Sequence, residues 1–62
     1  MYNVKACREE IGMSQEELSV KSGVSRAIIS GLESGRVETT TTATLQKIAD
    51  ALGKKVSEIF LD

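Results

Sequence analysis

Few side chains in this sequence could catalyse a reaction or bind a metal. The chain has no histidine and one cysteine, Cys7, so it lacks both a set of zinc ligands and the base of a histidine-dependent triad. Its paired carboxylates, Glu9–Glu10 and Glu16–Glu17, are sequence neighbours, and adjacent residues diverge on a helix instead of facing each other. We therefore expect no enzyme activity, no bound metal and no cofactor.

The composition indicates one small globular domain spanning residues 1–62, with 40% apolar and 27% charged residues and a net charge of −1. A single cysteine forms no internal disulfide, and we expect Cys7 to be a small buried side chain and not a redox sensor. No apolar run exceeds three residues and no leader-like segment opens the chain, so we expect a cytoplasmic protein without a membrane span. No small-molecule pocket is evident from the sequence.

Apolar residues recur at helical spacing along the chain. Ser14 followed by Glu17 matches a capping box, and glycines follow the ends of the apolar repeats. The helices predicted from these signals span about residues 2–11, 15–22, 25–34 and 42–52, with a last short helix from about residue 56. The fold class is therefore all-α, a compact five-helix domain.

The predicted helix 25–34 has an unusual outer face. The spacing places Ser25, Ile28, Ile29 and Leu32 inward, and it places Arg26, Ala27, Ser30, Gly31 and Ser34 outward. A solvated helix normally carries long charged side chains, and an interior glycine costs about 0.5–1 kcal/mol relative to alanine. Short, nearly uncharged side chains suit close approach to another object. A helix, a tight turn and such a second helix form the arrangement that enters a DNA groove.

The residues resemble the phage-repressor-like (Cro/XRE-type) helix-turn-helix DNA-binding family over nearly the whole chain. The resemblance is carried by MSQEEL at 13–18, SGVSR at 22–26, ISGLESGR at 29–36, LQKIADALG at 45–53, and Ile59 with Phe60. It implies a lambda-repressor-like domain whose second and third helices bind double-stranded DNA.

The resemblance also assigns roles to individual residues. The base-facing positions are Ser25, Arg26, Ala27, Ser30 and Gly31. Gln15 matches a position that contacts a phosphate or buttresses base-reading side chains, and Arg36 matches a backbone-contacting position. Arg8 and Glu33 match a partly buried ion pair between the first and third helices.

Two predictions rest on side-chain chemistry. Arg26 can bond O6 and N7 of guanine together, although a phosphate contact fits it equally well. The threonine run 39–42 predicts a loop and a helix cap, and its hydroxyls and amides, Thr41 among them, could also touch a phosphate. Both predictions concern the surface that would meet DNA.

The sequence departs from the family pattern at several positions. Ser19 and Ser22 replace common alanines but stay small enough for close helix packing. Ala27 and Gly31 stand where larger polar side chains often read bases, so base specificity would rest mainly on Arg26 and Ser30. The loop 37–41 lacks the usual proline, and a lysine occupies the usual cap position 55.

The leading functional hypothesis is a sequence-specific DNA-binding regulator, most simply a repressor or controller. Helix 25–34 would enter the major groove, and a homodimer would read two half-sites about 34 Å apart on a two-fold operator. Phe60 and Leu61, with Val56, are candidates for the dimer contact, while burial of Phe60 in the core is the equal alternative. The alternative function is an antitoxin-like or other protein-interaction module that retains the fold, which the acidic balance and the depleted groove face favour.

Overall fold

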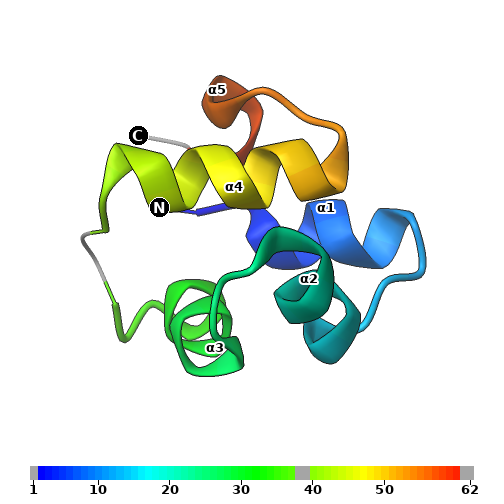
Figure 1. Cartoon of the computed structure of the whole chain (residues 1–62), viewed down its shortest axis with the longest axis horizontal. Coiled ribbons are helices and arrows are strands. Elements are labelled where there is room, and N and C mark those ends of the chain that lie inside the picture. The colour runs from blue at the N-terminus through cyan, green and yellow to red at the C-terminus, as the bar shows by residue number, and fades with distance from the viewer. Residues whose placement is uncertain (1, 38–39, 61–62) are drawn as a thin grey trace.

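The computed structural model describes residues 2–37 and 40–60, and it is all-helical as predicted. The helices are α1 (Val4–Glu10), α2 (Gln15–Ser22), α3 (Arg26–Ser34), α4 (Thr42–Leu52) and α5 (Val56–Ile59). Figure 1 shows α4 across the middle, with α5 on one side of it and α2 and α3 on the other. Among these residues no helix is long and apolar enough to cross a membrane.

Side-chain hydroxyls begin the three longest helices. Ser14 accepts the Glu17 N–H at 3.0 Å while the Glu17 carboxylate accepts the Ser14 N–H at 3.0 Å, which completes the capping box. Ser25 and Thr41 cap α3 and α4 in the same way, each accepting one N–H of the first turn. These bonds satisfy backbone donors that have no partner within the helix. The predicted boundaries of α2, α3 and α4 follow from these local signals.

The first helix is shorter than the predicted span 2–11. Asn3 N–H donates to the Ile59 carbonyl at 2.7 Å, and Tyr2 forms an isolated antiparallel bridge with Phe60. The segment before α1 therefore pairs with the end of α5 and cannot wind into a helix. At its other end α1 stops at Glu10, which leaves Ile11 50% exposed and not on the buried face that the spacing indicated.

The core is one cluster to which every helix contributes a fully buried side chain. These five residues are Val4, Leu18, Ile29, Ile48 and Ile59, each 0% exposed. Burial of such a side chain contributes about 1.5–3 kcal/mol, so the five together fix how the helices pack. Cys7 is also buried, and its sulfur accepts a long hydrogen bond from the Asn3 amide at 3.7 Å.

Two residues of the predicted inner face of α3, Ser25 and Ile28, do not belong to the core: Ser25 is the exposed cap before the first turn. Ile28 is 39% exposed, whereas the adjacent Ile29 is completely buried. Consecutive residues lie about 100° apart around a helix, so the two isoleucines cannot both point to the centre of the cluster. Ile28 lies at the edge, and the prediction that grouped it with Ile29 is wrong.

Candidate nucleic-acid interface

The turn between α2 and α3 is held by two serine side chains. The Ser19 hydroxyl donates to the Val24 carbonyl at 2.7 Å, and the Ser22 hydroxyl accepts the Val24 N–H at 3.1 Å. Gly23 takes a left-handed conformation with φ of 74°, and Val24 is buried beneath the turn. The serines therefore satisfy both polar backbone groups of Val24. Their small size was the only role predicted for them, and these hydrogen bonds were not.

A buried ion pair ties α3 to the rest of the domain. Arg8 Nε donates to Glu33 Oε2 at 2.8 Å and Arg8 Nη2 donates to Oε1 at 2.9 Å, a two-pronged contact between α1 and α3. The third nitrogen, Nη1, donates to the Met13 carbonyl at 2.8 Å. The side chains of Arg8 and Glu33 are only 11% and 4% exposed. The structure thus brings together the two residues that the resemblance paired.

Gln15 joins this pair from the first turn of α2. Its amide nitrogen donates to Glu33 Oε1 at 3.0 Å, so the carboxylate of Glu33 is bonded from both α1 and α2. One of the two hydrogens of the Gln15 amide nitrogen is thus used by the ion pair, which makes the side chain a buttress of α3. The second hydrogen is still a donor that a phosphate oxygen can accept. Contact with DNA at Gln15 stays a prediction.

The charges of the pair are set by their surroundings. Burial alone would raise the pKa of Glu33, but hydrogen bonds from Arg8 and Gln15 and the charges of Arg8 and Lys5 outweigh it, so this pKa lies below its ordinary value. The hydrogen bond to Glu33 raises the pKa of Arg8, which burial opposes and nearby carboxylates reinforce. Both groups are therefore charged at neutral pH, and the contact is a true ion pair.

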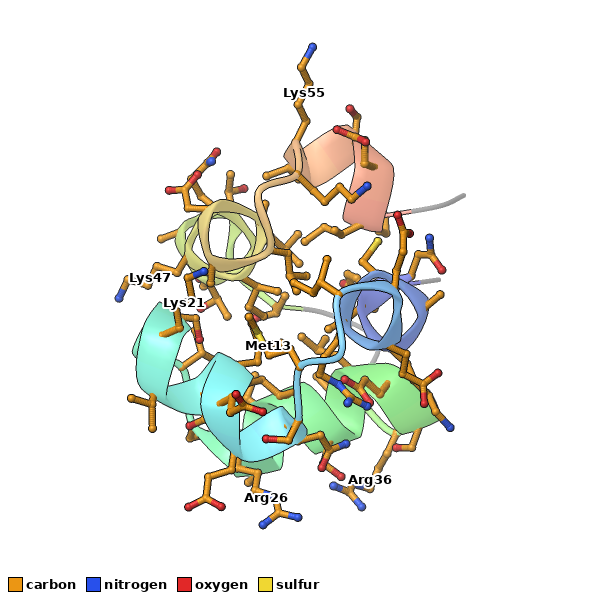
Figure 2. All side chains as sticks on the ribbon, turned by 90° about the vertical axis from the view of Figure 1, so that its right-hand side faces the viewer. Met13, Lys21, Arg26, Arg36, Lys47 and Lys55 are labelled. Atoms are coloured by element: carbon orange, nitrogen blue, oxygen red, sulfur yellow. The ribbon has the colours of Figure 1, made fainter. Side chains whose placement is uncertain are left out.

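The exposed residues of α3 gather at its N-terminal end, with Ser34 also exposed in the last turn as predicted. Ser25, Arg26 and Ala27 are exposed, and Ser30 is half-buried. Figure 2 shows Arg26 and Arg36 projecting at the end of the molecule that α3 forms, while Lys47 and Lys55 project elsewhere. Because the Ser25 oxygen accepts the Ile28 N–H, its hydroxyl hydrogen is still available for an external acceptor.

Gly31 differs from the other predicted base-facing residues because it is buried. The chain that follows α3 folds back, and Val37 and Arg36 lie beside it. Helical spacing on its own places position 31 outward, and spacing cannot show that a later segment covers it. Whether Gly31 contributes to DNA contact stays a prediction.

Thr41 is exposed at the start of α4, but its hydroxyl is already used. It accepts the Thr44 N–H at 3.1 Å and donates to the Thr44 hydroxyl oxygen at 2.9 Å. The hydroxyl hydrogen left for an external acceptor is that of Thr44, which the sequence analysis did not single out. Thr39, in the same run, lies outside the described residues.

A hollow of about 290 Å³ adjoins the exposed edge of α3, and its lining residues are Lys5, Arg8, Gln15, Ser30, Glu33 and Ser34. It brings Lys5 of α1 close to the serines of α3. Sequence reasoning missed Lys5, although its three-residue spacing from Arg8 places both on one side of α1. Among the described residues, no three histidine, cysteine or carboxylate side chains lie close enough together to hold a metal ion.

Comparison with known proteins gives one family and two curated relatives. A family model described as helix-turn-helix matches residues 4–59. An uncharacterized HTH-type transcriptional regulator of Sinorhizobium fredii is 43% identical over 51 residues, covering 82% of this chain and 65% of that protein. An uncharacterized HTH-type transcriptional regulator of Methanothermobacter thermautotrophicus is 37% identical over 59 residues, covering 94% of this chain and 84% of that protein. The chain thus spans just under two thirds of the first relative and most of the second.

Proposed function

Because this chain belongs to the Cro/XRE-type helix-turn-helix family of DNA-binding transcriptional regulators, we propose that it acts as a repressor or controller by occupying an operator. In this proposal α3 enters the major groove of double-stranded DNA, and a homodimer reads a two-fold site. Residues 1–62 act as one domain, in the cytoplasm. No catalytic step is required, since occupancy of the operator is itself the regulatory event.

One observation supports the proposal most directly: α3 is fastened on its inner side and open at its N-terminal end. Ile29 is fully buried and Glu33 is bonded to two other helices, while Arg26 and Ala27 are exposed. A rigid helix that presents its N-terminal residues is what direct reading of base edges requires. The side chains of α3 then lose little additional conformational entropy when they bind DNA, because the backbone that carries them is already fixed.

The proposed contacts divide into two kinds. Arg26 and Ser30 read base edges, with Ser25 and Ala27 beside them. Arg36 contacts the DNA backbone, and the first turn of α4, which Thr41 begins, adds a further phosphate contact through its backbone N–H groups. Few cations lie at this end of the molecule, so affinity would depend more on fit than on charge. The logarithm of the binding constant should therefore fall only modestly with log salt, by about 0.9 per phosphate neutralised.

The proposed dimer uses the exposed ring of Phe60, which lies beside the partly buried Tyr2. Phe60 is 42% exposed, so it is not a fully buried core residue, and its ring centroid lies 5.2 Å from that of Tyr2. Val56 packs half-buried against the core nearby in α5. Leu61, also predicted for this contact, lies outside the described residues. An apolar patch at this position suits a small two-fold interface.

A selection from random oligonucleotides tests the function. We expect enrichment of a two-fold symmetric site with half-sites about one helical turn apart. Arg26→Ala should relax preference at one base pair of each half-site. Recovery of no preferred sequence by the wild-type protein would rule out the proposal, and recovery of an asymmetric single site would rule out the homodimer alone.

A protein-binding role is the second candidate. Val20 on α2 is 81% exposed, and it borders a hollow of about 490 Å³ whose other lining residues are Met13, Glu16, Glu17 and Lys21. An exposed apolar side chain among charges is a feature of interaction surfaces. Affinity purification from the native host with wild-type protein and Val20→Ser would test this. A stoichiometric partner that is captured by wild type and lost by the variant supports an antitoxin-like role.

A further inference from the structure

The segment after α3 packs tightly over Gly31. A Cβ atom at position 31 would lie 2.4 Å from Val37 Cγ2 and 3.2 Å from Val37 Cβ. Real Cβ atoms do not approach another carbon as closely as Val37 Cγ2 would lie, and Val37 is itself half-buried against the core. The present path of the chain after α3 therefore requires glycine at this position.

The same segment is bonded to the Gly31 backbone. The Gly31 carbonyl accepts the Val37 N–H at 3.0 Å and the Ser34 hydroxyl at 3.3 Å. The Ser34 oxygen in turn accepts the Arg36 N–H at 3.4 Å. Gly35, with φ of 80°, reverses the chain between them. The backbone on either side of Arg36 is thus fixed to the last turns of α3.

This packing decides where the Arg36 guanidinium lies. Arg36 Nη2 is 3.7 Å from the point that a Cβ at position 31 would occupy, so the side chain runs back along α3 beside Gly31. Figure 2 shows Arg36 projecting at the same end of the molecule as Arg26. A free C-terminal loop would not keep a long side chain next to the exposed surface of α3.

We propose that Gly31 is a positioning residue: it lets the segment 35–37 close over α3, and this closure aims the Arg36 guanidinium at a DNA backbone phosphate. The inference rests on the proposed function of α3 in the major groove. It differs from the idea that Gly31 lets DNA itself approach the helix, because the group that occupies the space beside Gly31 is Val37 of the same chain.

The test measures operator affinity over a salt series for wild type and for Gly31→Ala, Val37→Ala, Arg36→Ala and the double variants Gly31→Ala/Arg36→Ala and Gly31→Ala/Val37→Ala. We expect Gly31→Ala and Arg36→Ala each to weaken binding about tenfold, as for loss of one charged hydrogen bond. Each should also reduce the salt slope by about 0.9, the signature of one phosphate contact. Gly31→Ala/Arg36→Ala should bind no worse than Arg36→Ala.

The variant Gly31→Ala/Val37→Ala tests whether Val37 is the group that requires the space beside Gly31. Removing the Val37 methyl groups removes the clash with Cγ2 and leaves only the 3.2 Å approach of the Cβ at position 37, which a shift of a few tenths of an ångström relieves. We therefore expect recovery of the wild-type salt slope. A double variant that is folded and still lacks this slope would overturn the inference, as would an unchanged slope in Gly31→Ala. Thermal unfolding of each variant identifies loss of fold, and if Gly31→Ala alone does not fold, the double variant carries the test. Absence of operator binding by wild type would instead remove the proposed function.

Discussion

Helices α3 and α4 are built alike on the inside and differently on the outside. Each begins at a hydroxyl cap, ends at a left-handed glycine and buries one isoleucine completely, Ile29 in α3 and Ile48 in α4. On the exposed side of α4, the Gln46 amide donates to the Asp50 carboxylate at 2.8 Å, one helical turn away. On the exposed side of α3 lie Arg26, Ala27 and part of Ile28.

This difference shows that exposed side chains of α4 bond to each other, whereas the exposed surface of α3 is suited to contact a partner. Pairs one turn apart stabilise a solvated helix by about 0.2–0.5 kcal/mol each, and α4 contains such a pair. The α3 surface combines one long cation with short and apolar groups, a poor surface for water and a good one for a partner that supplies hydrogen bonds and apolar contact. Substitutions matched between the two helices, or between the two sides of α3, test this difference.

The largest effect is expected at the buried isoleucines. Ile29→Ala and Ile48→Ala should each lower the free energy of unfolding by about 2–5 kcal/mol, because each leaves a cavity in the core. Ile28→Ala, the matched control one residue away, should cost about 1 kcal/mol or less, since its side chain is already partly solvated. Chemical denaturation measures all three. Equal losses at Ile28 and Ile29 would contradict the assignment of the two sides of α3.

The second effect concerns the tether of α3 to α1 and α2. Glu33→Ala should lower the free energy of unfolding by about 3 kcal/mol, because it strands the charge of Arg8 in a nearly buried position. The paired variant Arg8→Met/Glu33→Leu should recover much of this loss, since it leaves no unpaired charge. A melting curve for Glu33→Ala that matches wild type would show that the ion pair does not form in solution.

The third comparison removes one exposed cation from each helix and measures operator binding. Arg26→Ala should weaken operator binding by about 1–3 kcal/mol if the side chain reads guanine, with the melting temperature unchanged. Lys47→Ala removes an exposed cation from α4 and should leave binding nearly unchanged. Fluorescence anisotropy with the selected operator measures both. Equal losses for the two variants would mean that overall charge, and not the α3 surface, determines binding.

The caps of the two helices should be nearly equivalent. Ser25→Ala and Thr41→Ala should each lower the free energy of unfolding by about 1 kcal/mol, because each leaves one N–H of the first turn without a protein acceptor. Replacement by asparagine, another good cap, should restore most of it. A loss of DNA affinity for Ser25→Ala that persists well below its melting temperature, and that Ser25→Asn does not restore, would assign Ser25 a direct contact as well.

The smallest expected effect is on the pH dependence of the melting temperature. Because hydrogen bonds and charges lower the pKa of Glu33 in the folded state, the stability this group supplies is fully present above the unfolded pKa of about 4.3. It is lost as the pH falls through the lower, folded-state pKa. Glu33→Gln should therefore show a shallower decline of melting temperature below pH 4.3 than wild type. Glu17, whose pKa is lowered by its bonds to Ser14, should preserve part of the decline.

Helix boundaries could be predicted because their signals are local. Ser14, Ser25 and the glycines that follow α2, α3 and α4 act within a few residues of themselves, and the structure places those helix ends where the signals do. Helical periodicity also identified Ile29 and Ile48 as core residues. It does not mark where a helix meets the margin of the core, so it misplaced Ile11 and Ile28.

The features that could not be predicted depend on contacts between segments. The burial of Gly31 depends on the path of the chain six residues later, and no spacing within α3 encodes that path. The bonds of Ser19 and Ser22 to Val24 depend on the exact shape of the turn. For Arg8 and Glu33, 25 residues apart, the family resemblance supplied a pairing that periodicity could only place at the margins of two helices.

The bridge between Tyr2 and Phe60 brings the two ends of the described chain together. Two copies that meet at the proposed Phe60 contact would place the chain ends of both copies beside that contact, so a flexible linker there would join them in tandem. Such a tethered pair would raise the effective concentration of the second copy at its half-site, and its operator occupancy would no longer depend on assembly from free subunits.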